Sequence, residues 1–366
     1  MLRLQRILPD DYTGATADEL ARRIESAKEA LGEQLLILGH HYQRDEVMRW
    51  ADARGDSLAL SRLAAAHTDA RYIVFCGVHF MAEAADILTG AHQQVILPDL
   101  NAGCSMADMA DLDAVEEAWE AIAEVCDIDR VVPITYINSS AALKAFVGRH
   151  GGAVCTSSNA RAILSWSLGE RGGRQVLFFP DQHLGRNTGY QLGYDEKAMA
   201  VWDPRVESGG VDDTVLKGAT LLLWKGHCSV HQRFRPGHVA QFRAEHPDGV
   251  VVVHPECAHD VVDAADLAGS TDFIISTVRD ARPGAIIAVG TEIHLVKRLA
   301  DENPDKTIVS LDPLVCPCST MYRIDAAHLA WVLDGLVAGV VHNQITVPGT
   351  VATEARVALD RMLAIA

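Results

Sequence analysis

Short apolar runs alternate with amphipathic stretches along almost the whole chain. This alternation predicts parallel strands joined by crossover helices, which places the chain in the α/β class. A first helix is expected at 17–31, with Thr16 as its cap and Gly32 as its stop. The expected strands are 35–38, 72–75, 95–97, 131–135, 153–155, 176–179, 221–224, 250–253, 273–276, 285–289 and 307–311.

Polar residues recur in a fixed order after these runs and indicate an internal repeat. Each member of one trio returns 214 positions later, so that His40, Ser57 and Cys104 are followed by His254, Thr271 and Cys318. A third trio lies between them, with the same order but a wider spacing: Tyr136, Ser157 and Cys228. Residues 186–219 have no counterpart in the other copies, so we interpret them as an insertion.

Three copies of about one hundred residues each are long enough for three small domains with cores of their own. The predicted limits are 1–126 for the first repeat, 127–245 for the second with its insertion, and 246–366 for the third with a C-terminal segment. A single large domain fits the repeat less well.

Composition narrows the possible functions. The formal net charge of −17 disfavours sequence-independent nucleic-acid binding, because that binding needs a basic surface. Hydrophobic residues make up 49% of the chain, yet no apolar run approaches the ~20 residues that span a bilayer. No secretory apolar segment precedes the first expected helix, so we expect a cytoplasmic protein that binds neither nucleic acid nor membrane.

Eight cysteines in such a protein are more typical of thiols or metal ligands than of a disulfide framework. Cys76, Cys126 and Cys155 lie in or beside apolar segments and are expected to be buried. Cys257 follows a strand end without an evident role. Cys316 and Cys318 are two residues apart, and the repeat register favours Cys318.

One thiolate from each repeat raises the question of what three thiolates could hold. Zinc, unliganded thiols and an iron-sulfur cluster all remain possible from the spacing alone. A [4Fe-4S] cluster on three cysteines would leave one iron without a protein ligand, and that iron could act as a Lewis acid.

In parallel sheets, ligands bind beyond the carboxyl ends of the strands. His40 and Tyr42 lie two residues apart at such an end, as do His254 and Glu256, so each pair is expected on one face. A histidine and a carboxylate suit proton transfer, with Glu256 as base and His254 as acid or substrate ligand. A packing role for these residues, or helix capping by Glu256, is the alternative.

Three hydroxyls hold equivalent places in the repeats, each near an expected helix start. Ser57, Ser157 and Thr271 could therefore cap helices or bind anions such as phosphate and carboxylate. Ser158 competes with Ser157 for the second position. His231, three residues after Cys228, is expected to support the site rather than enter the chemistry, and Glu292 is expected to support its neighbours.

Ten segments of this sequence closely resemble quinolinate synthase. They span roughly residues 35–325 in order, and together they are highly specific. The segments are GHHYQ (39–43), GDSLALS (55–61), PDLNAGCSMADM (98–109), ITYINSS (134–140), CTSSNA (155–160), FPDQHLG (179–185), WKGHCSVH (224–231), HPEC (254–257), GTEIHLVKRL (290–299) and CPCSTM (316–321).

The resemblance implies three similar αβα domains with short parallel sheets around a pseudo-threefold axis. It implies an enzyme of NAD biosynthesis that condenses iminoaspartate with dihydroxyacetone phosphate to quinolinate, with loss of phosphate and two waters. An aspartate oxidase would supply the iminoaspartate. One [4Fe-4S] cluster per chain is implied, held by Cys104, Cys228 and Cys318.

The resemblance also places further residues in the substrate pocket. Catalytic roles are implied for Glu256, His254, Tyr42, Tyr136 and His40. Substrate contacts are implied for His40, Ser57, Tyr136, Asn138, Ser157, His254, Glu256 and Thr271. Two rival functions remain: an iron-sulfur hydro-lyase acting on another hydroxy acid, and a non-catalytic iron-sulfur electron carrier.

Overall fold

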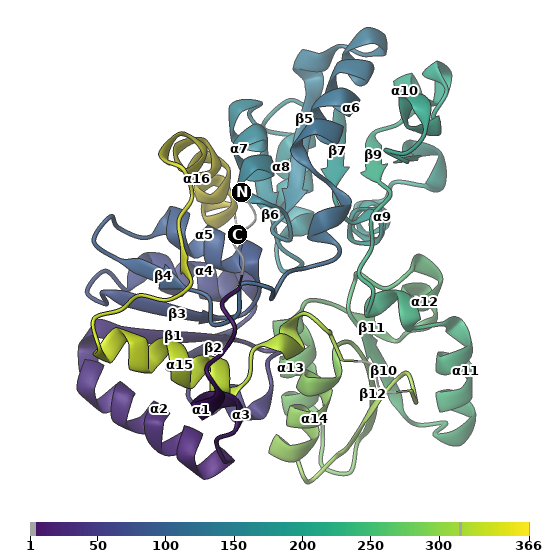
Figure 1. Cartoon of the computed structure of the whole chain (residues 1–366). Coiled ribbons are helices and arrows are strands. Elements are labelled where there is room, and N and C mark those ends of the chain that lie inside the picture. Colours follow the sequence, from purple (N-terminus) through teal and green to yellow (C-terminus); the bar gives the residue numbers. More distant parts are fainter. Residues whose placement is uncertain (1–4, 315–316, 366) are drawn as a thin grey trace. The chain divides into compact units, whose positions relative to one another are not determined.

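The computed structural model describes residues 5–314 and 317–365, and these divide into two compact units. The first unit comprises residues 1–104 and 317–348, and the second comprises residues 105–316 and 349–366. Both units are built on short, mostly parallel strands, most of which are labelled in Figure 1. The α/β class predicted from the alternation of apolar runs is confirmed.

The described residues of the first unit form one sheet in the order β14-β4-β3-β1-β2. Four strands are parallel, and β14 joins β4 antiparallel through Gln344 opposite Ile96. The strands are β1 (Leu35–His40), β2 (Ala53–Gly55), β3 (Tyr72–Cys76), β4 (Gln94–Ile96) and β14 (Gln344–Ile345). Its helices are α1 (Asp10–Thr13), α2 (Ala17–Leu31), α3 (Asp45–Met48), α4 (Ser57–Ala66), α5 (His79–Leu88) and α15 (Ala326–Val337).

In the second unit, residues 105–314 and 349–365 form two sheets, both wholly parallel. One has the order β6-β5-β7-β9-β8 and the other β11-β10-β12-β13. The strands are β5 (Val131–Tyr136), β6 (Ala153–Cys155), β7 (Gln175–Phe179), β8 (Met199–Trp202), β9 (Leu221–Trp224), β10 (Val250–Val253), β11 (Leu267–Ala268), β12 (Ile286–Gly290) and β13 (Thr307–Ser310).

Ten α-helices accompany these two sheets in the described part of the second unit. They are α6 (Leu112–Val125), α7 (Ala141–Arg149), α8 (Ala160–Leu168), α9 (Gln182–Gln191), α10 (Asp213–Gly218), α11 (Pro236–Glu245), α12 (His259–Ala264), α13 (Thr271–Asp280), α14 (Ile293–Glu302) and α16 (Gly349–Ala364). No helix in residues 5–314 or 317–365 is long and apolar enough to cross a membrane.

When β8 is set aside, all three sheets share one strand order, in which the first strand lies between the second and the third and the next strand follows the third. The interpreted insertion supplies β8, which extends the middle sheet beyond β9. The repeat is visible in atomic detail. Asp52 accepts a hydrogen bond from the backbone N–H of Ile37 (2.8 Å), and Asp266, 214 positions later, accepts one from Val251 (2.7 Å).

The three sheets thus correspond to repeated αβα modules, while the pseudo-threefold axis and the limits at 126 and 245 stay predictions. The C-terminal part of the segment that the prediction assigns to the third repeat packs against helices of the other two repeats. Helix α15 contacts α2 in the first unit, and α16 contacts α7 in the second.

The first helix forms as predicted, because its ends carry strong signals. The Thr16 hydroxyl accepts from the Glu19 backbone N–H, and the Glu19 carboxylate accepts from the Thr16 N–H, which forms a capping box. Gly32 follows the helix with a φ of 52°, a value that glycine adopts without strain.

One predicted strand is wrong. Residues 273–276 lie inside α13, which the Ser270 hydroxyl caps by accepting from the Phe273 N–H. Its buried residues are Thr271, Ile274 and Val278, a spacing of three and four that matches a helix. The β-branched Ile pair resembles a strand locally, but the helical period of burial decides the structure.

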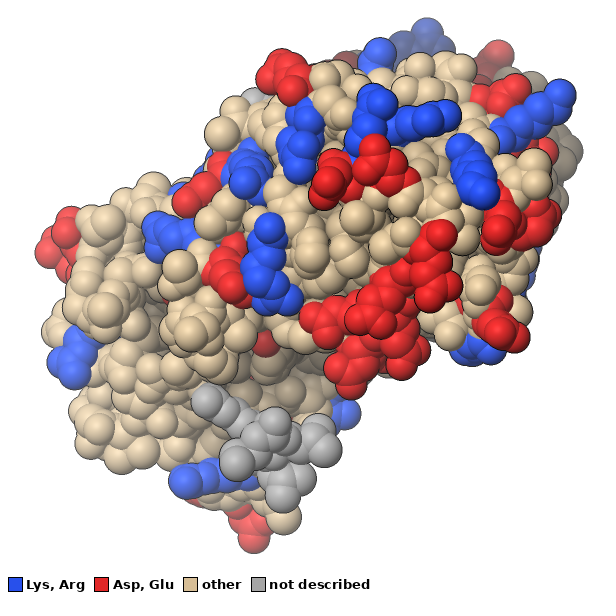
Figure 2. Space-filling view, turned by 90° about the horizontal axis from the view of Figure 1, so that it is seen from above, with Lys and Arg blue, Asp and Glu red and all other residues tan. Residues whose placement is uncertain are grey.

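The face in Figure 2 shows how charge is distributed over part of the surface. Lys and Arg side chains are interspersed with Asp and Glu, and one group of acidic side chains lies together. This face has no continuous basic patch.

The contact between α7 and α16 depends on a glycine. A Cβ atom at Gly148 would overlap the carbonyl oxygen of Glu354 in α16. We expect Gly148→Ala to lower the free energy of unfolding by about 1–3 kcal/mol, because the backbones would have to separate. Urea unfolding checks this. Gly218→Ala is the matched control, since a Cβ there meets nothing within 4 Å, and an equal loss in both variants would contradict the account.

Candidate active site

A buried carboxylate lies where two sheets of the second unit present the carboxyl ends of their strands. Glu256 follows β10 and is 4% exposed. The Tyr136 hydroxyl, at the end of β5, donates to Glu256 Oε1 at 2.6 Å. His231 Nδ1, in the 3-10 turn His231–Arg233 after β9, lies 2.8 Å from Glu256 Oε2. Both carboxylate oxygens are therefore engaged.

Two further residues fix the orientation of this group. The His231 Nε2 atom lies 3.1 Å from the Thr291 hydroxyl at the end of β12. The Glu256 carboxylate and the Thr291 hydroxyl thus contact opposite nitrogens of the His231 ring. His254 stacks on His231 with ring centroids 4.7 Å apart, and its Nδ1 accepts the Glu256 backbone N–H at 3.3 Å.

The proton affinities of these groups follow from burial and charge. Burial alone would raise the pKa of Glu256, but His231 and the hydrogen bond from Tyr136 lower this pKa to about 2. Burial lowers the pKa of His254 to about 3, so its imidazole is neutral at about pH 7. The arrangement is an ionised carboxylate beside a neutral histidine.

Asp181 is a second buried carboxyl group, which follows β7 and is fully inaccessible. Its Oδ1 accepts the backbone N–H of His183 at 2.9 Å and caps α9, whereas Oδ2 has no hydrogen-bond partner within the described ranges. Burial, together with the Glu256 charge, raises the pKa of Asp181 well above its ordinary value. The environment therefore favours the protonated acid at Asp181.

The Cys228 thiol belongs to the same site. One ligand atom each from Cys228, His231 and Glu256 lies within 4.8 Å of the others, and these three could hold a metal ion. Cys228 is partly exposed, as are Cys104 and Cys318, whereas Cys76, Cys155 and Cys257 are buried. Cys126, expected to be buried, is partly exposed.

The first unit brings together the segments that carry Cys104 and Cys318. Asp99, which is 1% exposed, accepts a hydrogen bond from Arg323 Nε at 2.9 Å. Asp99 lies five residues before Cys104, and Arg323 lies five residues after Cys318. Cys316 lies outside the described residues.

The pair His40 and Tyr42 reproduces the geometry of His254 and Glu256. His40 Nδ1 accepts the Tyr42 backbone N–H at 3.2 Å at the end of β1, and the two rings meet edge to face at 4.8 Å. The same local turn thus presents a tyrosine in the first repeat and a carboxylate in the third. Both follow a histidine that is nearly inaccessible.

The predicted anion-binding hydroxyls do not serve as helix caps. Asp56 caps α4 and Ser270 caps α13, so Ser57 and Thr271 are the first helical residues. Ser157 is half-buried before α8, whereas its competitor Ser158 is exposed. Asn138 follows β5 and is half-buried. Glu292 caps α14 and accepts from His294, which fits the support expected of it.

The sequence analysis missed three residues that touch this site or its surroundings: Thr291, Asp181 and Asn187. Thr291 and Asp181 lie inside two of the motifs quoted above, and Asn187 lies two residues after one of them, so the motifs were the signal that could have found them. The contacts of these residues could not be predicted, because they are made with other parts of the chain. His231 was expected in support, and the structure gives it direct contact with Glu256.

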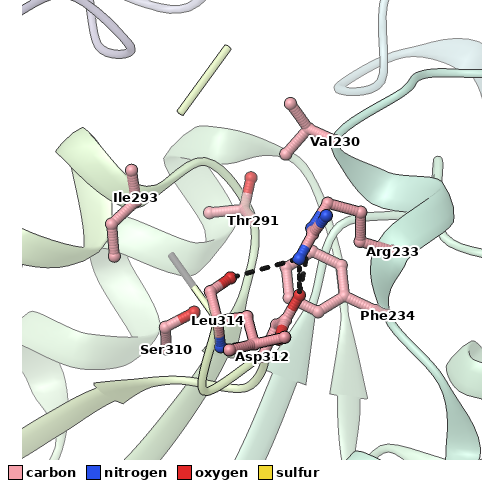
Figure 3. A pocket seen from close by; sticks show the side chains of 8 residues that line it. All are labelled: Val230, Arg233, Phe234, Thr291, Ile293, Ser310, Asp312 and Leu314. Atoms are coloured by element: carbon pink, nitrogen blue, oxygen red, sulfur yellow. Dashed lines mark hydrogen bonds and ion pairs between the residues drawn. The ribbon is translucent and has the colours of Figure 1, made fainter. Parts of the chain in front are cut away.

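Thr291 also lines a small pocket (Figure 3). Arg233 points toward Asp312, and its Nε lies 3.1 Å from the Asp312 carboxylate. Asp312 also accepts the Leu314 backbone N–H at 2.8 Å, so it holds the segment after β13 against the turn that carries His231. The remaining lining residues are Val230, Phe234, Thr291, Ile293 and Ser310.

Comparison with known proteins identifies the family. Residues 22–364 match the model of the family described as Quinolinate synthetase A protein. The chain belongs to this family. A quinolinate synthase of Corynebacterium glutamicum is 56% identical over 99% of this chain and 91% of the relative. Those of Herpetosiphon aurantiacus and a Geobacillus species are 55% and 53% identical, each over 98% of this chain and at least 95% of the relative.

This similarity over nearly the full length makes the chain an enzyme of the quinolinate synthase kind. The family resemblance inferred from ten segments is confirmed. The buried Tyr136, His231, His254 and Glu256 group lies within the matched residues of this family.

The depressed pKa of His254 predicts a pH dependence of stability. Because the unfolded chain binds a proton near the ordinary pKa of 6.5 and the folded site only near 3, stability is full above 6.5 and falls as the pH drops below it. In urea unfolding, His254→Gln should reduce the slope of unfolding free energy against pH by up to about 1.4 kcal/mol per pH unit. The exposed His67→Gln is the control. Equal slopes in wild type and His254→Gln would contradict the assignment.

Proposed function

We propose that the chain condenses iminoaspartate with dihydroxyacetone phosphate to give quinolinate, phosphate and two waters. The observation that carries this proposal is the buried Glu256 carboxylate, held by Tyr136 and His231 beside Cys228, in a chain of the quinolinate synthase family. This site combines a carboxylate, a neutral histidine and a metal-ligand group, which are the groups that proton transfer and dehydration require.

A [4Fe-4S] cluster is the proposed cofactor, with Cys104, Cys228 and Cys318 as its ligands. The donor set fits this group, because all three are partly exposed thiols and soft thiolates suit iron-sulfur clusters. When bound through only three cysteines, such a cluster supplies an open iron that polarises a departing hydroxyl.

The side chains of the second unit are proposed to move the protons. Glu256 is ionised and accepts a proton from the carbon next to the imine, while Tyr136 keeps the carboxylate aimed. His254 is neutral and its Nδ1 accepts the Glu256 backbone N–H, so its ring proton lies on Nε2 and can be donated in a hydrogen bond to a substrate oxygen. His231 holds Glu256 and is held in turn by Thr291.

The remaining predicted residues are proposed to bind substrate. His40 is the last residue of β1, and Tyr42 and Asn138 each lie two residues beyond a strand, where pockets of parallel sheets lie. Ser57 and Thr271 are the first residues of α4 and α13, whose N-termini attract anions such as phosphate and carboxylate. Ser157 lies three residues before the first residue of α8, so its position relative to the helix differs from theirs. An aspartate oxidase would supply the iminoaspartate.

An anaerobic assay tests the proposed reaction. With dihydroxyacetone phosphate and freshly generated iminoaspartate, we expect quinolinate to form with one phosphate released per product. A hydro-lyase for another hydroxy acid, or an electron carrier, would form no quinolinate. Absence of quinolinate from protein with a full iron content would overturn the proposal.

The ligand assignment predicts how single thiol replacements act. Cys104→Ser, Cys228→Ser and Cys318→Ser should each lose the cluster absorbance and the synthase activity together, because three ligands are the whole protein contribution. Iron and sulfide analysis after anaerobic reconstitution checks this. Cys126→Ser is the matched control, since that thiol is also partly exposed and should leave both unchanged. A full cluster in one of the three variants would remove that cysteine from the ligand set.

A further inference from the structure

Helix α9 lies between the middle sheet and the turn that carries Glu256. Two glycines set one turn apart allow it close to the sheet: a Cβ at Gly185 would lie 2.7 Å from the Leu223 side chain, and one at Gly189 would lie 2.7 Å from Leu221. Residue 187 is two positions from each glycine, a rotation of about 200°, so it faces away from the sheet.

Asn187 occupies that opposite face and is 2% exposed. Its Nδ2 amide donates to two backbone carbonyls of one turn, that of Pro255 at 2.8 Å and that of Cys257 at 2.9 Å. These carbonyls belong to the residues on either side of Glu256. A single side chain from the second repeat thus binds the backbone on both sides of the proposed base in the third.

The orientation of this amide is itself fixed. Asn187 Oδ1 lies 2.9 Å from His259 Nδ1, which leaves the amide nitrogen for the two carbonyls. The His259 ring stacks on Tyr190, also of α9, with centroids 3.9 Å apart. The amide is therefore held at all three of its contacts, and its rotation by 180° would set an oxygen against two carbonyl oxygens.

We propose that Asn187 is a positioning residue, which holds the Pro255–Cys257 turn so that the Glu256 carboxylate meets Tyr136 and His231. This inference rests on the proposed function for the role of Glu256. Without the amide, two buried carbonyls would lose their donors, and the turn would shift to find others. Displacement of a reacting group by about 1 Å can reduce a rate by about 100-fold.

The test compares Asn187→Leu with Thr188→Val. The leucine has a similar shape but donates no hydrogen bond, and the control removes a neighbouring buried hydroxyl that bonds only within α9, to the Leu184 carbonyl at 2.7 Å. In Asn187→Leu we expect kcat to fall about 10–100-fold with KM changed less than about threefold and with unchanged iron content. Thr188→Val should keep kcat within about twofold.

A second readout separates this inference from the proposed function. Hydrogen exchange of the Glu256 and Cys257 amides should accelerate at least about tenfold in Asn187→Leu and not in Thr188→Val, whatever reaction the enzyme catalyses. Accelerated exchange in a protein that makes no quinolinate would overturn the function and support the positioning role. Unchanged exchange with unchanged kcat would overturn the positioning role alone.

A milder variant keeps the test decisive if Asn187→Leu does not fold. His259→Ala removes the third contact of the amide and leaves both carbonyl bonds possible. We expect kcat to fall several-fold, with the same exchange signature at reduced size. A purely structural Asn187 would lower the melting temperature in both variants while leaving the kcat of the folded enzyme unchanged, and that result would refute the inference.

Discussion

Burial of the Glu256 carboxylate is the constraint on which the rest of this site depends. An ionised carboxylate that is removed from water is costly unless hydrogen bonds and opposite charge replace its hydration. Tyr136 and His231 provide that replacement; Tyr136 is the last residue of β5, and His231 lies in the 3-10 turn that follows β9. The two sheets of the second unit must therefore present their strand ends to one point, and the fold and the chemistry are specified together.

The repeats share the backbone geometry of this arrangement but differ in the side chains that they place in it. His40 and His254 make the same hydrogen bond to the backbone N–H two residues later, yet one turn carries Tyr42 and the other Glu256. The Asp52 and Asp266 bonds to neighbouring strands are likewise equivalent. The module is thus conserved in its backbone contacts, and the chemical differences between copies lie in the side chains at the strand ends.

Local signals in the sequence account for much of the fold. The capping box at Thr16 and the apolar runs of β1, β6, β9 and β10 could be read directly, because each depends on neighbouring residues. Part of the helix at 271–280 was predicted as a strand, because its two adjacent isoleucines favour a strand locally. The helical spacing of its buried residues becomes evident only in the structure. The strands β2, β11 and β14 are only two or three residues long, whereas β8 lies in the segment that was interpreted as an insertion without counterpart in the other repeats.

The site was predictable as a set of strand-end residues but not as a network. Tyr136, His254 and Glu256 follow strands and were expected there, whereas the contacts of Thr291 with His231 and of Asn187 with the Glu256 turn join residues 60 to 70 positions apart. Such contacts follow from the packing of different repeats, and spacing along one repeat does not reveal them. The family resemblance gave residue roles but no account of what holds each residue.

The ionisation of Glu256 is the most direct measure of this account. Infrared difference spectra between wild type and Glu256→Gln, recorded from about pH 7 to about pH 4, report the carboxyl stretch of this one residue. With its pKa lowered to about 2, Glu256 should show the ionised carboxylate band throughout. A protonated carboxyl band that appears near pH 5 would mean that His231 and Tyr136 do not hold the carboxylate as described.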